Sequence, residues 1–197
     1  MLGMAADGLA QRVSSGFGQA LDPLVLQRAR RRDAAAQEAI YRLYSRACYN
    51  LALRILGNPA AAEDIVQDVF VRMLDALPGF RGDAPFGAWL KRMTTNATID
   101  MARRNRRLDT ESAEVHLERM AVEQPGPDVG VDAWSLLMRL SVRERAVVIL
   151  HELEGYTHKE LASLFGQSES YSKSVLARAL KRLGVLDAGT IEWRGDA

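Results

Sequence analysis

Basic residues gather in two blocks of the sequence, and their charge is suited to binding a polyanion. The first block, residues 91–107, holds six basic residues and one acid, Asp100. The second block, residues 173–182, holds four basic residues and no acid. Because clustered positive charge attracts phosphates, both blocks predict contacts with nucleic acid.

The first basic block has an aromatic and an amide side chain close to it, Trp89 and Asn96. Arginines hold phosphates, whereas aromatic and amide groups stack on, or hydrogen-bond to, bases that have left a duplex. This mixture favours a surface for partly unstacked nucleic acid. The alternative is that Trp89 is a core residue, which is at least as common for one tryptophan on a helix.

The second basic block lies on a predicted amphipathic helix. Its inward stripe is predicted to consist of Leu176, Ala179, Leu180 and Leu183. Ser172, Lys173 and Arg178 are then expected to point away from the core. Such a helix can enter the major groove of DNA, or it can be an ordinary solvated helix. The turn and the capped helix that precede it favour DNA binding.

Three polar residues, Asp64, Gln67 and Asp68, lie close together on one predicted helix. Neighbouring carboxylates can perform acid–base chemistry, but no fixed partner or pocket is evident in the sequence. A solvated or protein-binding face is the favoured interpretation.

His151, Glu152 and His158 could suggest a zinc site. The metalloprotease pattern, however, needs a second histidine four residues after the first, and that position is Gly155. The sequence also has no phosphate-binding glycine loop and no nucleophile motif. We therefore expect a protein that is not an enzyme and that uses no metal and no cofactor.

The elements that carry these residues are predicted to be helices throughout. Asp22 and Pro23 can begin a short helix, since aspartate caps free amides and proline is tolerated in the first turn. Longer helices are predicted for residues 33–57, 60–77 and 86–106, with a loop from Pro78 to Pro85 before the last one. No convincing strand alternation is present, so residues 22–108 are predicted to form a four-helix domain.

A second helical domain is predicted for residues 134–186. Ser141 with Glu144 and Thr157 with Glu160 each fit a capping box and mark a helix start. Ser168 or a neighbouring serine, Ser170, can cap a final helix. Helix, turn, helix, turn and helix in this order match a helix-turn-helix domain.

An acidic flexible linker is predicted between the two domains, at residues 109–133. Residues 109–132 contain seven acids and one arginine, a net charge of −6. One hypothesis is that this segment follows a basic nucleic-acid channel in a partner, and the other is that it is a simple tether. Residues 1–21 are interpreted as a flexible extension and residues 187–197 as a tail.

The composition suits a helix-rich globular protein, with 48% hydrophobic and 26% charged residues among 197. The single cysteine, Cys48, cannot form an internal disulfide and is expected to be buried. No apolar run resembles a signal peptide or a membrane span. We therefore expect a cytoplasmic location without stable membrane insertion.

Several motifs together resemble a known family, the extracytoplasmic-function (ECF) sigma factors of the sigma-70 type. The segment from Ala62 to Phe70 is similar to the family's polymerase-binding helix. The segment that begins at Pro85 and includes Asn96 is similar to its promoter-melting helix. Leu140-Ser-Val-Arg-Glu-Arg and Glu154-Gly-Tyr-Thr-His-Lys-Glu-Leu-Ala resemble the opening of its second domain.

This resemblance implies a function, which is to bind core RNA polymerase, recognise promoter DNA and direct transcription initiation under the control of an anti-sigma factor. The implied contacts to the beta and beta-prime subunits of polymerase are Asp64, Gln67, Asp68 and Phe70. The implied contacts to the downstream (−10) element, bound as single-stranded DNA, are Trp89, Asn96, Asp100, Arg103, Arg104, Arg106 and Arg107. The implied contacts to the upstream (−35) duplex are Ser170, Tyr171, Ser172, Lys173, Ser174 and Arg178.

The sequence departs from the family pattern in two places. Tyr171-Ser-Lys-Ser-Val175 stands where the family usually has Thr-Val-Lys-Ser-Arg, so the preferred upstream sequence cannot be transferred. Thr94 and Thr95 stand where the family often has an alanine and a basic residue, which predicts the loss of one phosphate contact.

Two other functions remain open from the sequence. One is a helix-turn-helix regulator that acts outside polymerase, against which the similarity of the Ala62–Phe70 segment argues. The other is a sigma-like decoy that binds only proteins, for which the basic residues of the two blocks would be unnecessary.

Overall fold

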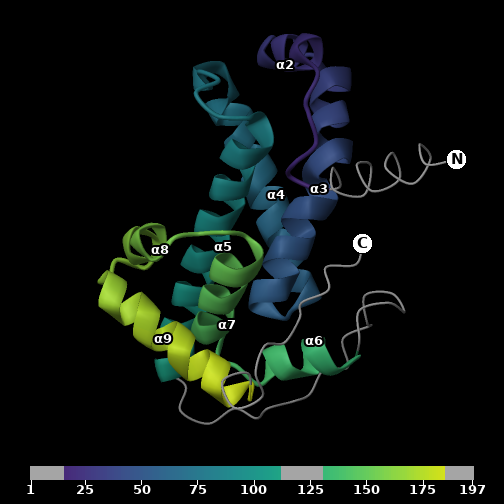
Figure 1. Ribbon diagram of the computed structural model, residues 1–197. Helices are drawn as coiled ribbons and strands as arrows, with labels where there is room; N and C mark the ends of the chain where they lie inside the picture. The colour runs from purple at the N-terminus through teal and green to yellow at the C-terminus, as the bar shows by residue number, and fades with distance from the viewer. Residues whose placement is uncertain (1–15, 112–130, 185–197) are drawn as a thin grey trace, which may run out of the picture. The chain divides into compact units, whose positions relative to one another are not determined.

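The computed structural model describes residues 16–111 and 131–184, and every regular element in these ranges is helical (Figure 1). The chain divides into two compact units. The first unit holds α2, α4, η1, most of α3 and the first half of α5, and the second holds α6 to α9 together with the end of α5. Both helical domains predicted from the sequence are therefore confirmed as all-helical.

The first unit is built from two complete α-helices, one 3₁₀ turn, most of a third α-helix and the first half of a fourth. They are α2 (Pro23–Arg30), α3 (Ala34–Leu56), α4 (Pro59–Ala76), η1 (Leu77–Gly79) and α5 (Phe86–Glu111). The predicted cap of α2 is present, because the Oδ1 atom of Asp22 accepts a hydrogen bond from the amide of Leu24 at 2.8 Å. Proline and glycine in η1 end α4 close to the predicted residue.

The core of the first unit is formed by the inward stripes of three helices. Its fully buried large side chains include Ile40, Tyr44, Leu51, Ile65, Met73 and Leu90. Removing each such side chain from water stabilises the fold by roughly 1.5–3 kcal/mol. The thiol of Cys48 is buried among them as predicted, and burial raises the pKa of Cys48 to about 11.

Residues 16–21, which the sequence-based interpretation assigned to the N-terminal extension, contact this core. The hydroxyl of Tyr44 donates a hydrogen bond to the carbonyl of Gln19 at 2.7 Å. A Cβ atom at Gly87 would lie 1.9 Å from the carbonyl oxygen of Phe17, so only glycine allows this close approach of the segment to α5.

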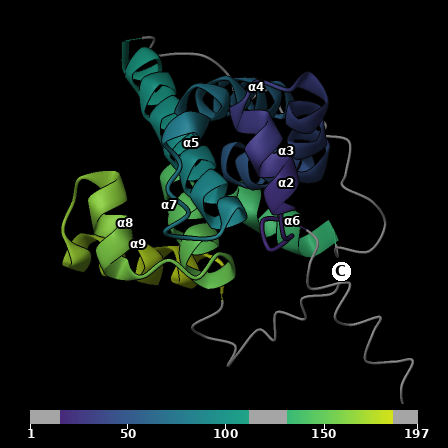
Figure 2. The same ribbon diagram turned by 90° about the horizontal axis from the view of Figure 1, so that it is seen from above.

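The second unit contains α6 (Val131–Met138), α7 (Val142–Val148), η2 (Ile149–Leu153), α8 (His158–Phe165) and α9 (Glu169–Arg182). Helix α9 packs against α7 and α8, which gives the predicted helix-turn-helix arrangement (Figure 2). Gly166 ends α8 in the left-handed conformation (φ 61°), and Ser168, one of the two serines considered, caps α9. The turn η2 is π-helical, a form that is rare in proteins.

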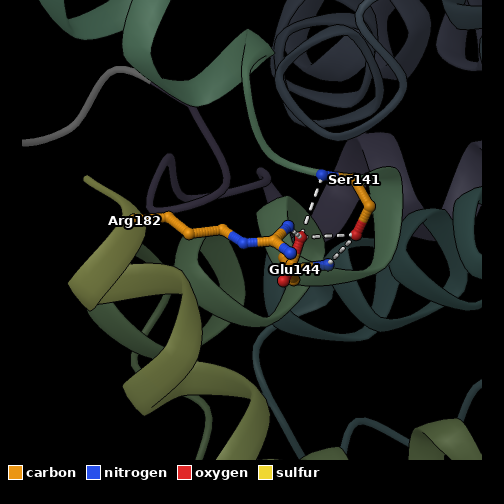
Figure 3. Close-up of polar contacts among 3 residues, drawn as sticks. All are labelled: Ser141, Glu144 and Arg182. Atoms are coloured by element: carbon orange, nitrogen blue, oxygen red, sulfur yellow. Dashed lines mark hydrogen bonds and ion pairs between the residues drawn. The ribbon is translucent and has the colours of Figure 1, made fainter.

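Both predicted capping boxes are present. At the start of α7, Glu144 is also the partner of an arginine on α9, as Figure 3 shows. One carboxylate oxygen of Glu144 accepts hydrogen bonds from the amide and the hydroxyl of Ser141 and lies 2.9 Å from the Nη1 atom of Arg182. Burial by itself would raise the pKa of Glu144, but the hydrogen bonds from Ser141 and the charges of Arg182 and Arg178 outweigh it and lower that pKa.

Two helix ends differ from the sequence-based prediction. Helix α5 continues to Glu111, five residues beyond the predicted end, and α6 begins at Val131, three residues before the expected start. The acidic residues that follow Arg107 therefore do not end α5 at the predicted position. Residues 112–130, which include most of the predicted linker, and the tail at residues 187–197 lie outside the described residues.

We predict that Glu144→Ala lowers the local unfolding free energy of α7 and α9 by about 1–2 kcal/mol, because it removes a helix cap and an ion pair together. Amide hydrogen exchange of these two helices measures the change. Since the folded pKa of Glu144 is lowered, the stabilisation is present at neutral pH and is lost as the pH falls through that pKa.

The matched variant is Glu144→Gln, which keeps the hydrogen-bonding capacity of the cap and loses only the charge. It should cost less than Glu144→Ala at pH 7. Equal exchange rates in the wild-type chain and Glu144→Ala at pH 7 would contradict a stabilising role for this carboxylate.

Candidate nucleic-acid and protein interfaces

The outer face of α4 carries the polar residues that the sequence singled out. Asp64 and Gln67 are exposed, and Asp68 forms an ion pair with Arg72 at 2.8 Å one turn further along the helix. Phe70 is only 7% exposed and packs edge-to-face on Tyr41, with ring centroids 4.8 Å apart. Phe70 therefore holds α4 against α3 and presents little surface to a partner.

Three large apolar side chains are exposed beside these polar residues. Val71 is 61% exposed, and Tyr41 and Leu74 are also exposed. Gln67, Val71 and Leu74 recur at helical spacing, so they share one face of α4. Exposed apolar surface with a polar rim is typical of a protein-binding site. The sequence had not singled out these apolar residues, because single apolar residues on a helix are usually assigned to the core.

An open groove of about 370 Å³ adjoins this face, between α3 and α4. The lining residues are Tyr41, Ser45, Arg46, Tyr49, Glu63, Val66 and Gln67. We name the outer side of α4 with this groove the α4 face. It combines carboxylates, an amide and aromatic rings, which together can receive a helical partner with both apolar and basic side chains.

Trp89 lies at the start of α5 and is half-buried in an aromatic cluster. Its ring centroid lies 4.9 Å from that of Phe80 and 5.4 Å from that of Phe86, and Phe86 in turn packs on Tyr44. Trp89 is therefore partly a core residue, as the alternative interpretation expects, and its contact with nucleic acid stays a prediction. The cluster also fixes the loop of residues 78–85, because Phe80 lies within that loop.

The polar face of α5 continues from Trp89 along the helix. Asn96, Asp100 and Arg104 are exposed, and Asp100 lies 3.5 Å from Arg103 in an ion pair. Trp89, Asn96, Asp100 and Arg103 follow each other at steps of seven, four and three residues, so they share one helix face. The side chains of Arg106 and Arg107, predicted to extend this face, lie outside the described residues.

Thr94 and Thr95 point into the core, on the opposite side of α5. Both are 0% exposed, and their hydroxyls donate to the carbonyls of Leu90 and Lys91, each at 2.9 Å. The hydroxyl of Thr98 does the same to the carbonyl of Thr94. A basic residue at either of the first two positions would be buried here, so these threonines fill the core beneath the polar face.

The loop of residues 78–85 is tied to α2 by an arginine that the sequence gave no reason to select. The Nη2 atom of Arg30 donates a hydrogen bond to the carbonyl of Phe80, and its guanidinium lies 5.9 Å from the centroid of the Phe80 ring. Within the loop, Arg81 forms an ion pair with Asp83 at 2.8 Å. No signal in the sequence connects residues 30 and 80, since they are far apart along the chain.

On α9, most of the predicted DNA-contacting residues are accessible. Ser170, Lys173, Ser174 and Arg178 are exposed. Tyr171 is half-buried, and its hydroxyl accepts a hydrogen bond from the Nη1 atom of Arg143 at 2.7 Å. Ser170, Lys173 and Ser174 lie in the first half of the helix, which is the part that a recognition helix presents to base edges, and Arg178 lies one turn beyond Ser174.

The expectation that Ser172 points away from the core is wrong. Its side chain is only 2% exposed, and its hydroxyl lies 3.0 Å from the Nδ1 atom of His158 on α8. Val175, one turn further along, is also buried at 2%. The inward stripe therefore begins earlier than predicted, because α8 covers this side of the first turns of α9.

A pair of stacked histidines lies beneath Ser172. The rings of His151 and His158 are 4.4 Å apart and nearly parallel, at 22°. The carbonyl of Tyr156 accepts a hydrogen bond from the Nδ1 atom of His151 at 2.7 Å, which fixes the tautomer of that ring. Burial, together with the charges of His151 and Lys173, lowers the pKa of His158, although Glu169 and Glu152 oppose the shift.

Residues 16–111 and 131–184 contain no group of three or more histidine, cysteine or acidic side chains arranged to hold a metal ion. Within the same residues, no helix combines the length and the apolar character that crossing a membrane requires.

Comparisons with known proteins agree with this arrangement of two helical units. The Sigma-70 region 2 family model matches residues 40–108, and the Sigma-70 region 4 family model matches residues 131–183. The chain therefore carries the two regions that define sigma-70-type proteins, in the same order.

Individual relatives indicate which kind of sigma-70-type protein the chain is similar to. The ECF RNA polymerase sigma factor SigM of Mycobacterium tuberculosis is 30% identical over 154 residues, which cover 78% of each chain. SigE of Mycolicibacterium smegmatis is 29% identical over 153 residues, or 74% of this chain, but the match spans only 59% of the length of that relative. The fold is similar to that of the sigma factor RpoE from Bartonella quintana, solved with the anti-sigma factor NepR, with a TM-score of 0.58, 24% identity and coverage of 78% of this chain and 98% of that one.

This chain belongs to the family of ECF RNA polymerase sigma factors. The membership confirms the resemblance found in the sequence.

We predict that His158 binds a proton at a lower pH in the folded chain than in the unfolded chain. NMR titration of the histidine ring protons measures both values. Because the folded pKa is lowered, the packing of α8 on α9 should weaken as the pH falls below about 6.5, where the unfolded state takes up the proton more readily.

The variant Lys173→Gln removes one of the charges responsible and should raise the pKa of His158. Lys181→Gln, which removes a charge near the other end of α9, is the matched control and should leave it unchanged. If the pKa of His158 in the folded chain equalled or exceeded its value in the unfolded chain, the stacked histidine pair would not disfavour protonation.

Proposed function

We propose that this chain binds core RNA polymerase and directs it to promoters, with one surface for polymerase and two for DNA. The observation that carries the proposal is that the two sigma-70 regions each present the expected kind of exposed surface. Region 2 has the α4 face and the polar face of α5, and region 4 has the first half of α9. A non-enzymatic initiation factor needs no reactive group at any of these surfaces.

The α4 face is the proposed site for polymerase. Asp64 and Gln67 supply a polar rim, and Val71 and Leu74 supply apolar surface that gains from burial against a partner. Phe70 would act from beneath by fixing α4 against Tyr41. The same surface is a natural target for an anti-sigma factor, because a protein that covers it would prevent polymerase from docking. The sigma factor RpoE of Bartonella quintana is an example of a relative in fold that is bound by an anti-sigma factor.

The polar face of α5 is the proposed site for the downstream promoter element in its melted form. The accessible side of Trp89 offers a surface for stacking an unpaired base, and Asn96 can hydrogen-bond to a base edge. Arg103 and Arg104 would hold the phosphates of the same strand. The loop of residues 78–85, anchored by Phe80, lies beside this face and would enclose a base that has left the stack.

The first half of α9 is the proposed reader of the upstream duplex. Lys173 and Arg178 can contact phosphates or bases, and Ser170 and Ser174 add short polar groups at the amino end of the helix. Ser172 would contribute indirectly, since its hydroxyl is directed at His158. The proposal for this residue therefore changes from base contact to the positioning of α9.

Run-off transcription with purified core polymerase tests the whole proposal. Promoter-dependent transcripts should appear only when the chain is added to core enzyme. If the chain bound promoter duplex but produced no transcripts, a regulator acting outside polymerase would explain the DNA binding. If the chain bound core enzyme without any DNA contact, a protein-binding decoy would be the better explanation.

We predict that Asp64→Ala with Gln67→Ala weakens binding to core polymerase by roughly tenfold, since two polar contacts at one interface typically contribute about 1–2 kcal/mol together. Fluorescence titration of labelled chain with core enzyme measures the affinity. The matched control is Gln27→Ala, an exposed glutamine on α2. Unchanged affinity in a folded double variant would exclude these two residues from the interface.

We predict that Arg103→Gln with Arg104→Gln reduces open-complex formation and that the deficit relative to the wild-type chain is largest at low salt and shrinks as salt is added. Each phosphate contact removed should lower the salt dependence of binding to single-stranded DNA by about 0.7 in the logarithmic slope. Permanganate footprinting of unpaired thymines measures melting. Arg42→Gln is the control, because Arg42 is an exposed arginine on α3 that pairs with Glu38. Normal melting in the double variant would contradict a phosphate-binding role.

A further inference from the structure

Three consecutive arginines stand at the turn between α2 and α3. Arg30, Arg31 and Arg32 are all exposed. We name these three residues the basic corner. The neighbouring Arg28 is neutralised by Asp33, with which it forms an ion pair at 2.8 Å. The basic corner therefore adds about three positive charges to the surface of the first unit.

The backbone of the basic corner is unusual at Arg32. Its φ angle is 63°, and among the described residues it is the only residue other than glycine with a positive φ. The amide of Arg32 donates to the carbonyl of Ala29 at 3.0 Å, and the amide of Asp33 donates to the carbonyl of Arg28 at 3.2 Å. This is the helix-ending pattern in which glycine is strongly preferred at the position of Arg32. An arginine here costs stability, which indicates that its side chain serves a purpose outside the fold.

The basic corner is joined to the loop of residues 78–85. Arg30 donates to the carbonyl of Phe80 and lies over its ring, and Phe80 packs on Trp89. Helix α2 and the turn η1 are in contact, and Figure 1 shows α2 beside the upper end of α4 where that turn begins. A continuous series of contacts thus connects the basic corner with the start of the polar face of α5.

The loop itself supplies no net charge to attract a nucleic-acid strand. Its only ionisable side chains, Arg81 and Asp83, form an ion pair with each other. A strand that placed a base against the loop would carry phosphates on both sides of that base. Positive charge for the phosphates on the α2 side of the loop is available at the basic corner.

We propose that Arg31 and Arg32 bind the phosphates of single-stranded promoter DNA next to the nucleotides held by the loop, and that Arg30 is a positioning residue for the loop. This inference rests on the proposed function of the α5 face. It adds a phosphate-binding surface to the one proposed on α5, formed by residues that precede the matched sigma-70 region 2 segment.

The test uses Arg32→Gly, a substitution that separates stability from DNA binding. Glycine relieves the left-handed backbone and should raise the melting temperature of the chain by a few degrees. The same change removes one charge, so it should weaken DNA binding by roughly threefold. A loss of affinity in a more stable protein cannot be attributed to unfolding. Arg32→Asn, which also tolerates this backbone, should behave in the same way, and Arg32→Lys should keep most of the affinity.

The probe is a fork-junction DNA with a single-stranded downstream element, taken from a promoter that supports run-off transcription and bound by the chain together with core polymerase. Arg31→Gln with Arg32→Gly should lower its affinity by roughly tenfold and the logarithmic salt slope by about 1.4, or 0.7 for each phosphate contact. Arg30→Gln should lower the affinity without changing the slope, because it alters the loop and removes no phosphate contact. Arg42→Gln is the control and should change neither quantity.

The outcomes separate this inference from the proposed function. If Arg32→Gly raises the melting temperature and leaves both affinity and slope unchanged, the basic corner does not bind DNA. If the double variant instead loses affinity for core polymerase in the absence of DNA, the corner is a protein contact, and the inference is also overturned. If Arg103→Gln with Arg104→Gln has no effect on the same probe, the failure lies in the proposed role of α5.

Discussion

The contact between Phe80 and Trp89 is the interaction on which the candidate DNA surface of the first unit depends. This contact joins the loop of residues 78–85 to the start of α5. The ring of Phe86 packs on both of these rings and also on Tyr44, a buried residue of α3. Aromatic pairs at these distances stabilise a fold beyond their buried area and also restrict the orientation of the rings. The loop can therefore be exposed along most of its length and still keep a defined position, which an element that holds a single base requires.

Inside α5, hydrogen bonds from threonine side chains to backbone carbonyls keep the buried polar groups paired. Thr94, Thr95 and Thr98 stand in the buried part of α5 and bond to carbonyls one turn earlier. Among the described residues, no buried side-chain nitrogen or oxygen lacks a hydrogen-bond partner. Such satisfied polar groups allow α5 to have a weakly apolar buried side and a strongly polar outer side without a loss of order.

Local signals predicted most of the fold, because helix ends are determined by residues close to them in sequence. The caps at Asp22, Ser141 and Thr157 are examples in which a short pattern and its hydrogen bond coincide. The candidate sites were predicted less completely, since exposure depends on distant elements. Ser172 was expected to face outward, and only the packing of α8 through His158 shows that it does not. The link between Arg30 and Phe80 spans fifty residues and leaves no periodic pattern.

Apolar and charged residues have different tasks in this fold. Aromatic and aliphatic side chains hold the loop, α4 and α9 in place, whereas most exposed arginines and lysines, apart from Arg30 and Arg182, contribute little to that packing. Most surface charges can therefore change at small cost in stability. Arg32 differs from these residues, because its backbone would be more stable with glycine. A residue retained against its backbone preference at the edge of a candidate DNA surface is best explained by what its charge binds.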